Sequence, residues 1–276
     1  MVKRLRSALV GFFSWGAPTA ALEPAGPAGK TVYAVGDIHG DLGTLDRLLA
    51  LIAADIAAEA RGDAWVGVEV CAGGETRERP LVIFLGDYVD RGAESAAVLD
   101  RLCADPVPGA ECRFLIGNHE AAMLGFLEDP AANAEWLSFG GAETLASYGI
   151  RASVGISSDV RCRALRDQLA ARVPDRHRAF LGGLDSHHIL SDYMFVHAGI
   201  QPGRALDRQH RDDLLWIREP FLSSRRSHPK VVVHGHTIVD APEFWPNRIA
   251  IDTGAYATGI LTALVIRGIT RRIIQT

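Results

Sequence analysis

Five short turns in the sequence carry side chains that bind metal ions, and each turn follows a run of β-forming residues. Aspartate, asparagine and histidine recur in these turns beside glycine, and none of the four cysteines lies in any of them. The turns are residues 36–40 (GDIHG), 86–92 (GDYVDRG), 117–120 (GNHE), 197–199 (HAG) and 234–237 (HGHT). Mixed oxygen and imidazole ligands suit manganese, iron or zinc. The set predicts a two-metal hydrolase site, in which paired ions about 3.5–4 Å apart hold a phosphoryl group and activate water.

Short, nearly apolar runs precede these turns. They are residues 31–35 (TVYAV), 81–85 (LVIFL), 113–116 (RFLI), 193–196 (YMFV) and 231–233 (VVV). Such runs predict strands of an α/β sheet that is covered on both faces. Ligands of these sheets gather beyond the carboxyl ends of the strands, so side chains far apart in the sequence can meet there. The glycines tolerate positive φ and let the backbone approach a bound ion closely.

The intervening segments predict a mainly helical surround. Apolar residues at three- and four-residue spacing predict a helix over 42–60, and a second helix is expected over 94–104. Residues 64–80 predict a hairpin or surface loop, and residues 260–266 and 269–274 a closing hairpin. Residues 130–188 are expected to be mainly helical, with Trp136, the Gly140-Gly141 pair and a charged helix over 159–172. This insertion either walls the cleft and selects substrates or is plain scaffold.

The ordered motifs resemble those of the PPP-type metallophosphatases, calcineurin-like enzymes that include bacterial relatives of the serine/threonine protein phosphatases. The resemblance runs from about residue 32 to residue 256. It implies an α/β fold of the calcineurin-like metallophosphoesterase kind, a two-sheet β-sandwich flanked by helices (αββα). It also implies two divalent metal ions, manganese being the common choice in bacterial members, with iron and zinc as alternatives.

The resemblance assigns a role to each motif residue. Asp37 and His39 would hold the first metal, and Asp87 would bridge the pair. Asn118, His197 and His236 would complete the second site, whereas His234 has no matching ligand role. His119 would be the general acid that protonates the leaving alkoxide, oriented by Asp90. Arg91 and Arg218 would grip the phosphate oxygens, and Tyr256 would lie on a loop over the site.

Two substrate classes and one non-catalytic alternative remain. Asp90 and Glu120 favour hydrolysis of phosphomonoesters, such as phosphoserine and phosphothreonine in proteins, because bacterial diadenosine tetraphosphate hydrolases typically lack the first and have aspartate in place of the second. In the other direction, Ile116 stands where many protein phosphatases have an arginine. A dinucleoside polyphosphate hydrolase is therefore the alternative. The third hypothesis is a non-catalytic scaffold protein that keeps the fold but hydrolyses no substrate.

Several motif residues also have structural readings. Asp37 or Asp41 could cap a helix. Glu120 could begin the next helix, where a carboxylate favours the positive end of the dipole, and Arg218 could belong to a packed, tryptophan-bearing segment. Histidines outside the motifs are expected to be surface or hydrogen-bonded residues; these are His177, His187, His188, His210 and His228.

Composition favours an enzyme domain. The 276 residues are 48% hydrophobic, and a net charge of −4 lacks the basic footprint of a nucleic-acid-binding protein. We expect a flexible tail over residues 1–29 and a metallophosphoesterase domain over 30–276. The beginning of the tail mimics a signal peptide, but a disordered or amphipathic segment that touches a membrane surface is favoured. No segment is long enough to cross a bilayer, and four cysteines without CxxC spacing indicate reduced thiols in a cytoplasmic enzyme.

Overall fold

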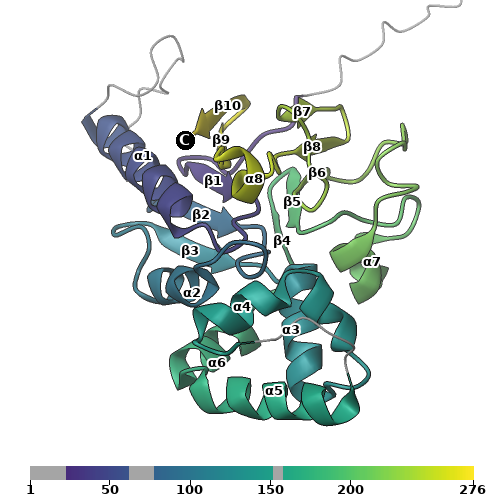
Figure 1. The fold of residues 1–276 in the computed structure, drawn as a ribbon. Coiled ribbons are helices and arrows are strands. Elements are labelled where there is room, and N and C mark those ends of the chain that lie inside the picture. Colours follow the sequence, from purple (N-terminus) through teal and green to yellow (C-terminus); the bar gives the residue numbers. More distant parts are fainter. Residues whose placement is uncertain (1–22, 62–77, 152–157) are drawn as a thin grey trace, which may run out of the picture.

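Two five-stranded sheets pack face to face, with helices on both outer sides (Figure 1). The structure, a computed structural model, describes residues 23–61, 78–151 and 158–276. The predicted αββα architecture is confirmed. Residues 1–22 of the expected tail and most of the segment predicted as a hairpin or loop (62–77) lie outside the described residues. Among the described residues, no helix combines the length and apolarity needed to cross a membrane.

The first sheet has three parallel strands at its centre and edge. These are β1 (Val32–Val35), β2 (Leu81–Phe84) and β3 (Glu111–Phe114), and β1 also pairs antiparallel with β9 (Thr262–Arg267). A hairpin joins β9 to β10 (Thr270–Gln275), as predicted, and gives the order β10-β9-β1-β2-β3. The carboxyl ends of β1, β2 and β3 therefore point to one edge, and the first three motif turns meet there.

The second sheet has the order β4-β5-β6-β8-β7. Its parallel centre consists of β5 (Tyr193–Val196), β6 (Val231–His234) and β8 (Arg248–Ala250), and its antiparallel edges are β4 (His187–Leu190) and β7 (Glu243–Phe244). The two remaining motif turns follow β5 and β6. Both sheets thus present the ends of parallel strands to the same region.

Successive side chains of the central strands point to opposite faces of the sheet and pack into separate hydrophobic clusters. In β1, Val32 and Ala34 pack into a cluster with Phe195 and Val233 of the second sheet. The alternate residues of β1 pack instead against the helix α1 (Leu42–Arg61), which covers the outer face of the first sheet with α2 (Ser95–Cys103). A third cluster joins the outer face of the second sheet to α7 (Arg211–Trp216). Burial on both faces explains why these strands are apolar throughout.

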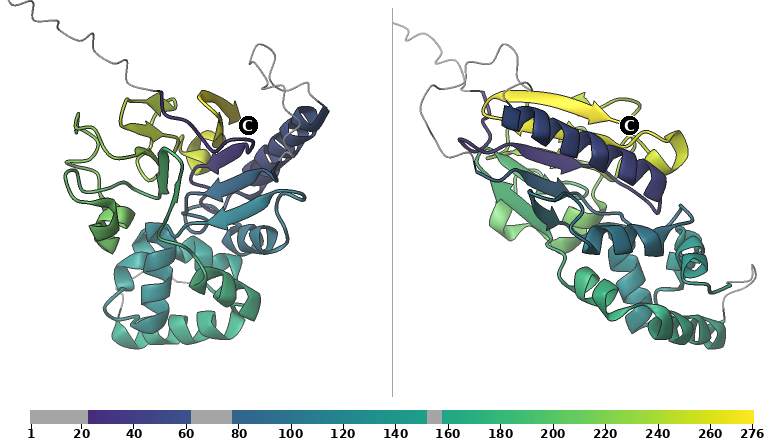
Figure 2. Two further views of the ribbon diagram at one scale, coloured as in Figure 1. Left: turned by 180° about the vertical axis from the view of Figure 1, so that it is seen from behind. Right: turned by 90° about the vertical axis from the view of Figure 1, so that its left-hand side faces the viewer.

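The segment between β3 and β4 forms a helical layer at one end of the sandwich, visible from front and back (Figures 1 and 2). It contains α3 (Asn118–Glu128), the 3-10 turn η1 (Ala134–Ser138), α4 (Gly141–Ser147), α5 (Asp159–Arg172) and α6 (Asp175–Gly182). Another 3-10 turn, η2 (Leu206–Arg208), precedes α7, and the one-turn helix α8 (Ala255–Thr258) precedes β9. The expected charged helix over 159–172 is confirmed.

Two local predictions differ from the structure. The strand expected over 113–116 begins at Glu111, because the β2 ladder extends to this half-exposed edge, and Ile116 donates instead to Asp185 O at 2.8 Å. β4 occupies the end of the segment expected to be helical, since antiparallel pairing with β5 decides its conformation. In the segment predicted as a tail, Ala25 N donates to Asp192 Oδ2 at 3.0 Å and Gly26 N to Gly268 O at 2.8 Å.

Candidate metal centre

The motif turns adopt a strained backbone and hold one another. His39, Asp87, Asp90, Arg91 and His236 have φ between 51° and 73°, five of the seven described non-glycine residues with positive φ. Each such conformation costs on the order of 1–3 kcal/mol and persists where the surroundings impose it. Here His39 N donates to Asp87 O at 2.8 Å, and Gly92 N donates to His39 O at 3.0 Å. The first and second turns therefore fix each other's geometry.

Glycine is required where two turns approach these carboxylates. A Cβ on Gly117 would overlap Asp87 Oδ1, and a Cβ on Gly235 would overlap Asp37 Oδ1. Any side chain at either position would displace the carboxylate from the centre.

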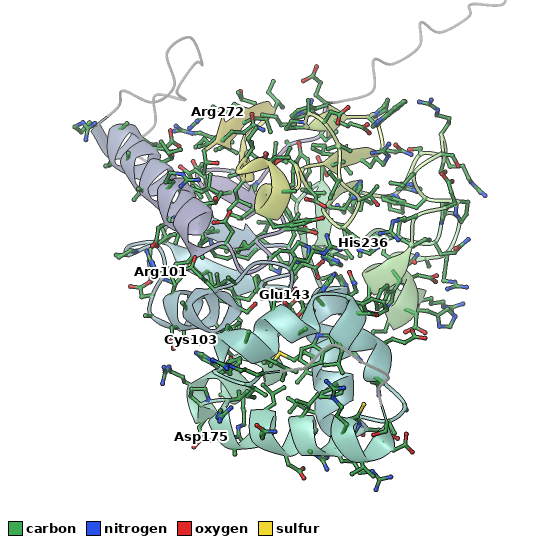
Figure 3. The ribbon with its side chains drawn as sticks, in the orientation of Figure 1. Arg101, Cys103, Glu143, Asp175, His236 and Arg272 are labelled. Atoms are coloured by element: carbon green, nitrogen blue, oxygen red, sulfur yellow. The ribbon has the colours of Figure 1, made fainter. Side chains whose placement is uncertain are left out.

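Asp87 lies between two groups of buried side chains. Its Oδ2 is 3.4 Å from His39 Nε2, and its Oδ1 is 3.5 Å from His197 Nε2. The potential ligand atoms of His39, Asp87 and His119 lie within 4.8 Å of one another, as do those of Asp87, His197 and His236. Figure 3 shows His236 next to α7. Two groups that share one carboxylate have the arrangement expected of a bridging ligand.

Potential ligand atoms of Asn118, His197 and His236 converge, and one pair of them has no hydrogen to share. His197 Nδ1 donates to Leu85 O at 3.0 Å, which leaves Nε2 as an acceptor. That nitrogen lies 2.8 Å from Asn118 Oδ1 and 3.2 Å from His236 Nδ1. The amide oxygen cannot donate a hydrogen to it, so a cation best accounts for this approach. His39 is oriented similarly, with Nδ1 3.1 Å from Val89 O and Nε2 facing the centre.

The electrostatics of the centre also fit a divalent cation. Burial lowers the pKa of His39 and of His236 to about 3, so both imidazoles are neutral and can offer a lone pair at neutral pH. Burial would raise the pKa of Asp87, but the neighbouring imidazoles of His197, His119 and His39 hold it below its ordinary value. Within the part of the chain that the structure describes, buried Asp37 Oδ1 has no hydrogen-bond partner. Ionised and unpartnered ligand atoms are what a metal ion would satisfy.

Asp37 belongs to neither of these two groups and has an acidic neighbour, Asp252. The Oδ2 atom of Asp37 accepts a 3.0 Å hydrogen bond from His236 N, and Asp37 does not cap a helix. Asp41 is the cap: its Oδ1 accepts from Thr44 N at 2.9 Å at the start of α1. Burial and then Asp252 raise the pKa of Asp37, while burial raises the pKa of Asp252 to about 6. The sequence does not predict a role for Asp252, because this residue lies outside the five motif turns.

The predicted acid and phosphate-binding residues surround this centre. His119 Nδ1 lies 2.7 Å from Asp90 Oδ2, and Arg91 Nη2 lies 3.2 Å from His119 Nε2. Burial acts to lower the pKa of His119, but Asp87 and Asp90 outweigh it and raise the value. The ring of Tyr256 lies 4.9 Å from the Arg91 guanidinium carbon and 5.4 Å from the His39 ring. Arg218 is close enough to contribute to the lowered pKa values of the second-group histidines.

Glu120 has a contact that the sequence did not reveal. Its Oε1 accepts from Tyr88 N at 2.7 Å and Val89 N at 3.1 Å, and its Oε2 accepts from Asp87 N at 2.8 Å and Gly117 N at 3.0 Å. The carboxylate does more than favour the start of α3, because it ties this helix to the second motif turn. The signal available in the sequence was its position directly after His119.

Two further residues contact Asp90, namely Trp136 and Thr144 of the helical insertion. By contrast, His177 has a structural environment, as expected for a histidine outside the motifs. Its Nε2 lies 2.7 Å from Asp100 Oδ1 and its Nδ1 2.8 Å from Tyr148 Oη. Among the described residues, Cys103, Cys112 and Cys162 form no disulfide.

Comparisons with known proteins agree with this centre. Residues 30–257 match the model of the calcineurin-like phosphoesterase family. The chain is 26% identical over 199 residues to the bis(5'-nucleosyl)-tetraphosphatase PrpE (asymmetrical) of Geobacillus thermodenitrificans, an alignment that covers 66% of this chain and 73% of the relative.

Two solved structures share the fold. One, assigned provisionally as a diadenosine tetraphosphatase, has a TM-score of 0.54 and 21% identity, with 89% of this chain and 93% of that chain covered. A cold-active protein tyrosine phosphatase has a TM-score of 0.54 and 16% identity, with 88% and 78% covered. With the matched region spanning all five motif turns, the chain belongs to the calcineurin-like phosphoesterase family and is a metallophosphatase.

Proposed function

We propose that this enzyme hydrolyses phosphomonoesters and that phosphoserine and phosphothreonine in proteins are its substrate class. The observation that carries the proposal is the 2.7 Å contact between His119 Nδ1 and Asp90 Oδ2. A serine or threonine alkoxide is a strongly basic leaving group, so its departure requires a proton. An imidazolium held by a buried carboxylate, with Nε2 directed into the centre, is suited to supply it.

The remaining side chains divide between metal binding and phosphate binding. Asp37, His39 and Asp87 would hold one ion, and Asp87 with Asn118, His197 and His236 the other. A divalent pair, manganese in this proposal with iron or zinc as alternatives, would neutralise phosphate charge and lower the pKa of bound water. Arg91 and Arg218 would bind phosphate oxygens, and Tyr256 packs over Arg91.

The second candidate function is hydrolysis of dinucleoside tetraphosphates. It is favoured by the relative from Geobacillus thermodenitrificans, whose name states that activity. The same ligands would serve this reaction. The leaving group would differ, because a nucleotide phosphate is a weaker base than an alkoxide and departs with less help from an acid.

The Asp90→Asn variant tests the proposal on both substrates. With manganese present, we expect its kcat on a phosphothreonine peptide to fall by roughly 10²–10⁴-fold, and any turnover of diadenosine tetraphosphate to fall far less. Asp55→Asn is the matched control, because Asp55 accepts a 2.7 Å hydrogen bond from Tyr33 Oη on the far side of the first sheet. An undiminished rate on the peptide would remove the acid role.

A further inference from the structure

The carboxylate of Asp90 is gripped by two residues of the helical insertion. Trp136 Nε1 donates to Asp90 Oδ2 at 2.9 Å, and Thr144 Oγ1 donates to Asp90 Oδ1 at 2.6 Å. The same threonine oxygen accepts from Asp90 N at 2.9 Å. Asp90 and Thr144 are completely buried, and Trp136 is 1% exposed. The side chain of Asp90 is therefore fixed from the insertion, and its backbone N–H is shared between Thr144 and Ser95 of α2.

These bonds determine which direction His119 faces. Oδ2 of Asp90 is shared between Trp136 Nε1 and His119 Nδ1, while Oδ1 is taken by Thr144. The carboxylate cannot rotate without breaking at least one bond in a buried environment, where a lost partner is costly. A fixed carboxylate restricts the orientation of the imidazole, and hence the direction of His119 Nε2, which lies 3.2 Å from Arg91 Nη2.

We propose that Trp136 and Thr144 are positioning residues for protonation of the leaving group: by holding the Asp90 carboxylate, they orient His119. This inference rests on the acid role of His119 in the proposed function. In this role, residues 136–144 contribute to catalysis, and the insertion is more than a scaffold.

The spacing within this segment supports the assignment. Gly140 has a φ of 111°, and a Cβ there would overlap Arg91 N, so the loop lies directly against the turn that carries Asp90. A Cβ on Gly141 would lie 2.6 Å from the Trp136 ring. The two glycines allow the tryptophan and the threonine, eight positions apart, to reach opposite oxygens of one carboxylate.

Core packing is the competing explanation, since the Trp136 ring also lies 4.9 Å from the ring of Phe126. Two substitutions separate packing from hydrogen bonding. Trp136→Phe keeps an aromatic ring and removes the Nε1 donor. Thr144→Val keeps the branched shape and removes the hydroxyl, and Thr144→Ser restores the hydroxyl.

The experiment compares alkyl phosphate with aryl phosphate turnover. With manganese-loaded protein, Trp136→Phe and Thr144→Val should each lower kcat on a phosphothreonine peptide by about tenfold, the effect of one charge-assisted hydrogen bond. KM and metal content should remain unchanged. The loss should be much smaller on p-nitrophenyl phosphate, whose leaving group is a weak base, and Thr144→Ser should recover most of the rate.

The matched controls are Trp245→Phe, which removes a donor to Glu243 Oε2, and Thr31→Val, which removes a donor to Glu59. Neither control should change the ratio of the two rates.

Asp90→Asn, measured beside these variants, distinguishes the ways in which the inference can fail. If Asp90→Asn slows the peptide reaction selectively but Trp136→Phe and Thr144→Val do not, the positioning role is wrong and the proposed function stands. Equal losses on both substrates, or a loss of bound metal, would make the two residues structural and also overturn the inference. If Asp90→Asn itself shows no selective loss, the acid role fails and the positioning role falls with it.

Discussion

The buried carboxylate of Glu120 accepts a 2.8 Å hydrogen bond from the backbone N–H of Asp87, the residue that lies between the two potential metal groups. Three further backbone donors, Tyr88 N, Val89 N and Gly117 N, point at the same carboxylate. One side chain thus holds the second motif turn against the start of α3. The position of Asp87 depends on this contact as well as on its own strained backbone.

Replacing Glu120 with glutamine should destabilise the fold. The amide nitrogen of Glu120→Gln is a donor that would face backbone donors, so two of the four N–H groups would lose their acceptor. We expect the free energy of unfolding to fall by roughly 2–3 kcal/mol, measured by urea unfolding, together with reduced metal binding. Glu128→Gln, at the exposed end of α3, is the control. Equal stability of the two variants would show that Glu120 is dispensable for the turn.

Replacing Asp87 with asparagine should weaken binding of both metal ions together. The two oxygens of Asp87 face different groups, and an amide cannot bridge two cations as a carboxylate does. Elemental analysis of purified Asp87→Asn should show both ions lost in parallel, whereas Asp46→Asn, a surface partner of Arg101, should retain both. Loss of a single ion would contradict the bridging role.

The two arginines should not tolerate lysine. Arg91→Lys and Arg218→Lys each keep the charge but lose the planar pair of donors that suits a phosphate. We expect kcat/KM on a phosphomonoester to fall by about tenfold or more in each variant, with metal content unchanged. Arg79→Lys is the control, because Arg79 bonds the carbonyl oxygens of Gly109 and Ala110 away from the centre. A normal kcat/KM for Arg218→Lys would return Arg218 to a structural role.

His234 should make a pH-dependent contribution to the stability of the metal-free protein. Burial lowers its pKa from 6.5 to about 4, so between these pH values the unfolded chain binds a proton that the folded protein does not. The stabilisation is present above pH 6.5 and is lost as the pH falls towards 4. With EDTA present, the stability of the wild type relative to His234→Gln should therefore fall by up to about 1.4 kcal/mol per pH unit in this range. A difference between the two proteins that stays constant from pH 7.5 to 4.5 would contradict the assignment.

The sequence predicts the strands best where both faces are buried. Residues 81–85 were expected as a strand, and β2 occupies Leu81–Phe84, because each side chain enters one of two apolar cores. β4 was missed because it is a half-buried edge strand that begins with two histidines, and its conformation is set by pairing with β5. The residues of β4 alone do not indicate that this segment will pair with β5.

The candidate site, like the fold, can be predicted from the sequence only in part. The five motif turns can be predicted because each follows a strand, and the structure brings these turns together. The hydrogen bonds that support them come from distant residues: Trp136 is 46 positions and Thr144 is 54 positions from Asp90. Glu120 belongs to a motif turn, but its four contacts depend on how α3 meets the second turn. Such partners follow from packing in three dimensions, which spacing along one chain does not specify.

The most direct test of the proposed function is turnover of manganese-loaded protein on a phosphothreonine peptide and on diadenosine tetraphosphate, measured side by side with EDTA-treated protein. We expect a higher kcat/KM on the peptide and no turnover of either substrate without metal. A higher kcat/KM on the dinucleotide would contradict the phosphomonoester assignment and support the second candidate function. Turnover that survives complete removal of metal would contradict the metal centre itself.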